Sequence, residues 1–125
     1  MKTLFTFLVL GLGVSALGQA DFDTRLLAKY SEERINQLLE EQPSVIEYWT
    51  YYLDHSFTIV DEQSGKSFLT DETIKIKDVE NFNVLELDIY MDRKKPKAYR
   101  IKGTNKFLIL KSNDQFSQAY SLNRS

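Results

Sequence analysis

Residues 99–111 read YRIKGTNKFLILK, two apolar stretches separated by a short polar segment. Residues 99–102 alternate apolar and basic side chains, which is the period of a strand with one covered face. Gly103–Asn105 predicts a hairpin turn, because glycine accepts the positive φ that tight turns need. Phe107–Leu110 is a continuous apolar run, typical of a strand covered on both faces. These thirteen residues therefore predict a β-hairpin.

Shorter alternating patterns before the hairpin predict further strands. They lie at 57–60, 67–69, 74–77 and 85–89. The last of these also suggests a register, because placing Ile89 opposite Tyr99 aligns Leu87 with Ile101 on one face. The other face then pairs Asp88 with Arg100 and Glu86 with Lys102. We therefore expect an antiparallel meander of about five strands, with 93–97 at the tip of one hairpin.

Helices are predicted before and after these strands along the chain. Asp21–Glu41 repeats apolar residues at the helical period, as one helix or two. Pro43 ends that segment, because its ring disfavours helical geometry in the preceding residue. A Ser44–Glu47 capping box predicts a second helix over 44–54, and Ser112 begins a short third one. Helices followed by a meander and a short C-terminal helix predict an α+β domain.

Residues 1–20, MKTLFTFLVLGLGVSALGQA, predict a signal peptide. Lys2 precedes an apolar run that is short for a membrane span of about 20 residues. Small residues then allow a cut after Gly18 or, preferably, after Ala20. We therefore expect a single domain, 21–125, in the periplasm or secreted, with no transmembrane span. The chain has no cysteine, so its core must suffice without disulfides.

The positive charge of the chain is concentrated in one region. Residues 21–91 hold sixteen acidic and six basic side chains, whereas residues 92–111 hold one acidic and eight basic ones. Four of these bases fall at the predicted hairpin tip: Arg93, Lys94, Lys95 and Lys97. Such a cluster at an exposed turn predicts binding to an anionic surface or an envelope protein, or else a solubilising turn. Nucleic acid is not expected, because the rest of the chain is acidic and exported.

The sequence offers little catalytic chemistry. His55 is the only histidine and there is no cysteine, which excludes a zinc centre and a Cys–His pair. Asp54, His55 and Ser56 are adjacent, so they cannot point at one another as a hydrolase triad requires. Gly65-Lys66-Ser67 lacks the earlier glycine of a phosphate-binding loop. We therefore expect no catalytic residue, metal or cofactor.

A dense aromatic cluster supports an alternative. Trp49 and Tyr52 share the apolar face of the second predicted helix, whereas Tyr48 and Tyr51 point elsewhere. Tyr48, Tyr51 and His55 are therefore candidates for lining a groove between helix 44–54 and the sheet. A pocket there would make the protein a small-molecule binder or a weak enzyme.

Residues 99–112, together with the signal and the lack of cysteine, resemble small exported proteins of Bacteroidota. That resemblance implies no activity and no site residues. The order of helices and strands is also similar to cystatin-like and NTF2-like domains, which hold a groove between helix and curved sheet. The main expectation from the residues is an exported, non-catalytic binding module, with an accessory subunit of an envelope assembly as one such role.

Overall fold

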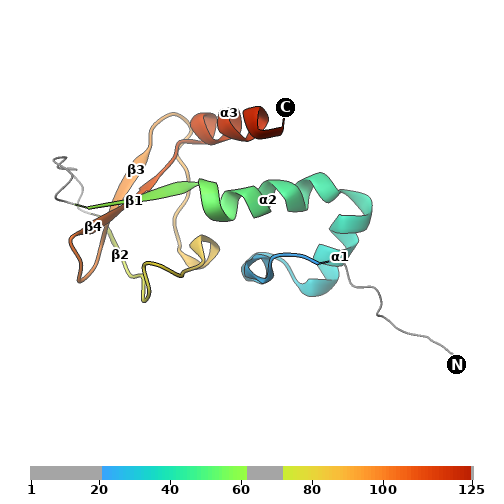
Figure 1. The fold of residues 1–125 in the computed structure, drawn as a ribbon, viewed down its shortest axis with the longest axis horizontal. Coiled ribbons are helices and arrows are strands. Elements are labelled where there is room, and N and C mark those ends of the chain that lie inside the picture. The colour runs from blue at the N-terminus through green and yellow to red at the C-terminus, as the bar shows by residue number, and fades with distance from the viewer. Residues whose placement is uncertain (1–20, 62–71, 125) are drawn as a thin grey trace, which may run out of the picture. The chain divides into compact units, whose positions relative to one another are not determined.

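The fold is α+β, as predicted. A computed structural model describes residues 21–61 and 72–124, and in that part the chain forms three α-helices and a four-stranded mixed sheet (Figure 1). The chain divides into two compact units, residues 1–47 and 48–125. The predicted signal peptide and the expected strand at 67–69 lie outside the described residues.

The first unit contains two helical pieces separated by a break. A 3₁₀ helix, η1 (Thr24–Ala28), is capped by Asp23, whose carboxylate accepts a hydrogen bond from the Arg25 backbone N–H at 3.0 Å. Helix α1 (Glu32–Glu41) is capped by Ser31. Each cap satisfies an N–H that a helix start leaves unpaired. From the sequence, residues 21–41 could form either one helix or two. The separate caps at Asp23 and Ser31 show that they form two.

Helix α2 (Pro43–His55) begins one residue earlier than predicted. Proline suits the first helical position, because its missing N–H would have no helical partner there. The Ser44–Glu47 capping box is therefore wrong, since Ser44 already lies inside the helix. The boundary between the two units falls within α2.

The sheet has the order β1-β4-β3-β2, and the predicted hairpin forms its centre. Its strands are β1 (Phe57–Asp61), β2 (Thr73–Ile74), β3 (Lys97–Ile101) and β4 (Lys106–Leu110). The turn between β3 and β4 contains Gly103 at φ 79°, the positive φ predicted for it. Phe107 and Leu108 are consecutive and both buried, so both faces of β4 are covered, as expected.

The predicted meander is wrong in two respects. Strand β2 pairs with β3 in parallel, with Thr73 opposite Arg100. The expected strand at 85–89 is absent from the described residues, where a 3₁₀ helix, η3 (Val84–Glu86), is followed by irregular chain. The register of Ile89 against Tyr99 therefore fails, because β4 and β2 occupy the two edges of β3.

The ion pairs built on that register fail with it. Arg100 lies in the sheet with its guanidinium 4.6 Å from the centre of the Phe107 ring, rather than beside Asp88. The alternation at 85–89 does not mark a covered face either, since the buried side chains there are Val84 and Ile89. A capped 3₁₀ turn, with Asn83 accepting from the Leu85 N–H, breaks the period.

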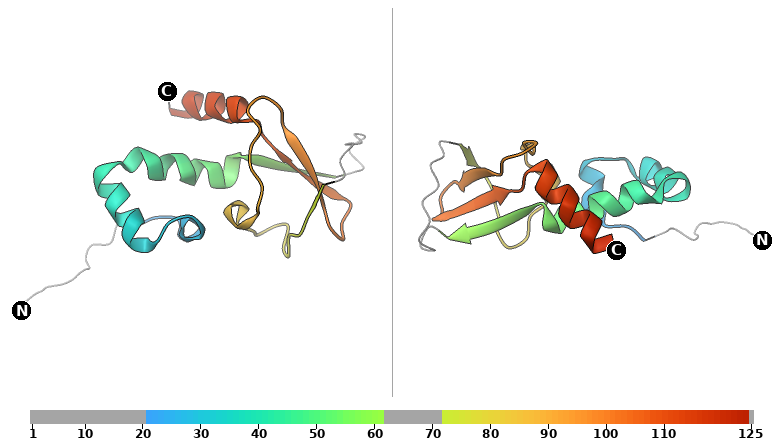
Figure 2. Two further views of the ribbon diagram at one scale, coloured as in Figure 1. Left: turned by 180° about the vertical axis from the view of Figure 1, so that it is seen from behind. Right: turned by 90° about the horizontal axis from the view of Figure 1, so that it is seen from above.

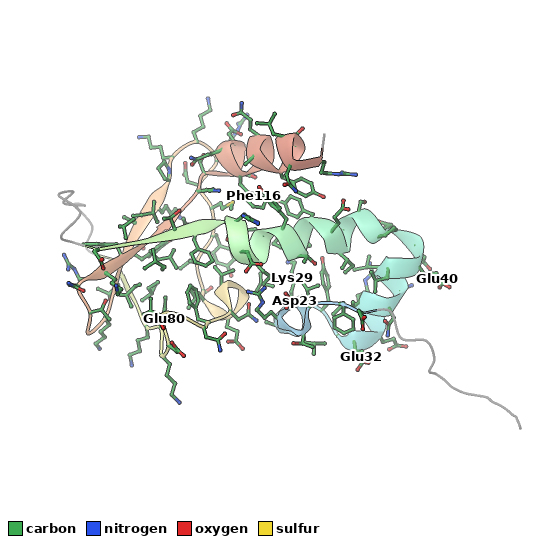
Figure 3. All side chains as sticks on the ribbon, viewed as in Figure 1. Asp23, Lys29, Glu32, Glu40, Glu80 and Phe116 are labelled. Carbon is green, nitrogen blue, oxygen red and sulfur yellow. The ribbon has the colours of Figure 1, made fainter. Side chains whose placement is uncertain are left out.

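Helix α3 (Asn113–Arg124) follows β4 and is longer than predicted. Ser112 caps it by accepting a hydrogen bond from the Gln115 backbone N–H at 3.1 Å. Figure 2 shows α3 starting at the end of the sheet where β4 finishes. Phe116 is fully buried and points from α3 toward α2 (Figure 3). The second unit thus joins its sheet and two helices through one apolar core.

Candidate functional site

Residues 92–97, which we call the basic loop, connect the irregular chain after η3 to β3. Arg93, Lys94 and Lys95 are exposed, and Lys97 is the half-buried first residue of β3. The four predicted cations thus lie on one short segment at the surface. Figure 1 shows this segment as the bend between β3 and the start of α3. It is not the tip of a β-hairpin, since only β3 follows it as a strand.

Asp92 fixes the backbone of the basic loop from within. One of its carboxylate oxygens accepts hydrogen bonds from the N–H groups of Lys94 and Lys95, at 3.0 and 2.9 Å. Aspartate commonly stabilises turns in this way. The N–H groups of Lys95 and Lys94 hold the pKa of Asp92 below its usual range, with the nearby charges of Lys97 and Lys95 adding to the effect.

Helix α3 holds the same loop from outside. The Asn113 N–H donates to the Asp92 carbonyl at 2.8 Å, and the Asp114 N–H donates to the Arg93 carbonyl at 3.1 Å. The first N–H groups of a helix have no partner within it, so the loop carbonyls fill this need. The basic loop is therefore anchored at two consecutive carbonyls as well as by the Asp92 side chain.

None of the four cationic groups forms an ion pair with another described residue, although the charges of Lys95 and Lys97 act on Asp92 from a greater distance. Within 21–61 and 72–124, no carboxylate lies at ion-pair distance from Arg93, Lys94, Lys95 or Lys97. Other bases in the same part of the chain are engaged: Lys106 pairs with Asp61 at 2.7 Å. The positive charges of Arg93, Lys94 and Lys95 are thus on exposed residues, and that of Lys97 is on a half-buried one.

Tyr90 lies two residues before the basic loop and was missed by the sequence analysis. Its side chain is 73% exposed, whereas the preceding Ile89 is 8% exposed. A hydrogen bond with Asp88 raises the pKa of Tyr90. In the sequence, Tyr90 looks like the end of a strand, and only its place beside the cations could have drawn attention to it.

Two of the candidate groove residues, Tyr48 and Tyr51, contact α3, and the third, His55, contacts Tyr51. The Tyr48 ring makes edge contacts with Phe116 and Tyr120, with ring centres 5.4 and 5.2 Å apart. The Tyr51 ring stacks on His55 at 4.2 Å and also contacts Tyr120 at 5.3 Å. Burial raises the pKa of Tyr48. The three residues therefore lie along one side of α2, and a groove against the sheet stays a prediction.

A pocket of about 320 Å³ lies elsewhere, in the stretch that follows β2. Its walls come from the single segment 75–87 and combine apolar side chains, amides, two lysines and two acids. None of the predicted site residues lines it. The two positive and two negative charges of its walls balance, so they do not indicate a particular class of ligand.

The described residues offer neither a metal site nor a membrane span. Within 21–61 and 72–124, no three His, Asp or Glu side chains are grouped to hold a metal ion. No helix in the same ranges has both the length and the apolar character needed to cross a bilayer. Comparisons with protein-family models, with curated proteins and with solved structures find no match.

Proposed function

We propose that this protein is an exported, non-catalytic binding module whose basic loop recognises an anionic partner in the cell envelope. One observation carries the proposal: four cations without ion-pair partners in the described residues sit on a backbone fixed by Asp92 and by α3. Exposed like charges on one segment repel each other unless something anionic meets them.

The anchoring of the loop favours a binding role over a solubilising turn. A turn that serves solubility needs charge but no fixed conformation. The basic loop instead has two hydrogen bonds from the Lys94 and Lys95 N–H groups to the Asp92 side chain. Two backbone–backbone hydrogen bonds from α3 hold it as well. Holding a loop in place before binding lowers the ordering cost when the partner arrives. The arrangement is therefore suited to recognition.

The test is partner capture with charge-matched variants. The first variant neutralises the basic loop: Arg93→Gln, Lys94→Gln, Lys95→Gln and Lys97→Gln. The control neutralises four lysines that are exposed elsewhere: Lys29→Gln, Lys75→Gln, Lys77→Gln and Lys102→Gln. Both variants have the same net charge, so only the position of the charge differs between them.

We expect tagged wild-type protein and the control to recover the same component from an envelope fraction of the source organism that is prepared without detergent, so that membranes stay intact. The loop variant should recover much less of it, and rising salt should weaken the wild-type capture, because exposed charges are screened over about 8 Å at physiological ionic strength. Equal recovery by the two variants at low salt would show that the basic loop is only a solubilising turn.

A further inference from the structure

The exposed ring of Tyr90 adds a second chemical type to the basic loop. Among the described residues, the large apolar or aromatic side chains with most exposure are Tyr90, Leu122 and Leu27, at 73%, 70% and 48%. Tyr90 alone of these three lies next to the cations. Burial of Ile89 at 8% exposure fixes the chain immediately before it. The chain therefore places an exposed aromatic ring, whose hydroxyl is hydrogen-bonded with Asp88, within seven residues of four positive charges.

This combination matches the interface of a lipid bilayer. Tyrosine is enriched at the level of the headgroups, because its ring is apolar and its hydroxyl is polar. Lysine and arginine near the surface are attracted to anionic headgroups. An acidic protein surface would satisfy the charges of Arg93, Lys94 and Lys95, but it would give no reason for an aromatic ring held in water beside them.

The form of the loop also suits a lipid surface. All residues from Asp92 to Pro96 are exposed, so the loop stands out from the unit on consecutive positions. A bilayer receives such a projection without a complementary cavity. The main negative charge within the loop, that of Asp92, is turned toward the N–H groups of Lys94 and Lys95.

We propose that the anionic partner is a lipid bilayer with negatively charged headgroups. Arg93, Lys94, Lys95 and Lys97 lie among the headgroup phosphates, and the Tyr90 ring enters the boundary beside them. This inference rests on the proposed function and names its partner class. The protein binds the surface reversibly and does not cross it through this loop.

The expected size of the effect follows from the number of charges. A lysine or arginine near an anionic surface contributes about 1 kcal/mol, which is about fivefold in the partition constant. Neutralising all four loop cations should therefore weaken binding by a few hundredfold. Tyr90→Ser alone should weaken binding several-fold, because the ring that leaves water on binding is then absent.

The experiment is co-sedimentation of the purified protein with vesicles. One set contains phosphatidylcholine alone, and the other contains about one third phosphatidylglycerol to give the negative surface. The two charge-matched quadruple variants are compared, together with Tyr90→Ser and, as its control, Leu122→Ser on α3. Far-ultraviolet circular dichroism and Trp49 fluorescence establish that each variant is folded.

We expect binding to the anionic vesicles only, lost in the loop variant and retained in the control and in Leu122→Ser. Failure of wild type to bind anionic vesicles, or equal binding by both quadruple variants, would overturn the inference. If a loop-dependent protein partner is still captured in that case, the proposed function stands and only its lipid partner is wrong. Unchanged binding by Tyr90→Ser would remove the ring from the interface.

Discussion

Replacing Phe116 by alanine should destabilise the second unit strongly and release the basic loop. The Phe116 side chain is 0% exposed. Its ring meets three tyrosines of α2, namely Tyr48, Tyr51 and Tyr52, at 5.4, 5.6 and 5.4 Å between centres. Truncating a buried phenylalanine to alanine costs about 3–5 kcal/mol, through lost transfer free energy and the cavity that remains. A domain has only about 5–15 kcal/mol of stability in total.

The free energy of unfolding can be measured by urea titration, with Trp49 as the fluorescent reporter. Trp49 lies 5.1 Å from Tyr48 and 5.0 Å from Tyr52 between ring centres, so it senses the cluster directly. Leu122→Ala is the control on the same helix, and at 70% exposure it should change stability by no more than about 0.5 kcal/mol.

The loss of Phe116 should also reach the basic loop. Because the Asn113 and Asp114 N–H groups hold the loop carbonyls, loosening α3 should speed hydrogen exchange at these two amides. A destabilisation below about 1 kcal/mol would refute the reasoning, since it would mean that Phe116 does not fill the space that its burial and ring contacts indicate.

Four further predictions concern single positions. Gly103→Ala should cost about 1–2 kcal/mol in urea unfolding, because nothing lies within 4 Å of an added Cβ and only the positive φ of 79° opposes it; Gly103→Asn should cost less, and equal losses would contradict a purely conformational origin. Ser56→Ala should leave thermal stability unchanged or slightly raised, because the buried Ser56 hydroxyl has no hydrogen-bond partner in the described residues. Ser112→Ala, which removes the α3 cap, should instead cost about 1 kcal/mol, and the same loss from both serines would argue against this difference. Acid titration followed by amide NMR should shift the Lys94 and Lys95 signals with a midpoint below the usual aspartate range, because the folded-state pKa of Asp92 is lowered. The loop stabilisation is then present above the usual aspartate pKa and lost as pH falls through the lowered one, whereas a midpoint at the usual value would disprove the clamp.

Local patterns in the sequence predicted the hairpin and the helices well. The Gly103 turn and the run Phe107–Leu110 are signals contained within a few residues, and the structure matches them. The parallel pairing of β2 with β3 could not be found in this way, because β2 is only two residues long and its partner lies more than twenty residues away. Alternation at 85–89 favoured a strand, but the cap at Asn83 produced a 3₁₀ turn that pattern counting does not detect.

In the candidate site, too, local sequence features could be predicted and long-range contacts could not. The cations at 93–97 can be read directly from the sequence, and Arg93, Lys94 and Lys95 are exposed as expected, whereas Lys97 is half-buried. The N–H groups of Asn113 and Asp114 anchor the loop through a long-range contact between backbone groups. Such a contact cannot be predicted from the types of side chain involved. Tyr90 was missed because an aromatic side chain is usually assigned to the core, and only the structure gives its exposure of 73%.

The contact between α3 and the basic loop can form only late in the synthesis of the chain. A chain made from its N-terminus presents Arg93–Lys97 well before Asn113 and Asp114 exist to hold the carbonyls of residues 92 and 93. Strand β1 likewise waits for β4, since Phe57 pairs with Leu110. Pairing across such a separation is slow compared with helix formation. The two contacts from α3 can form only after residues 113 and 114 are made, so an incompletely made chain carries the charges on a loop that Asp92 alone holds.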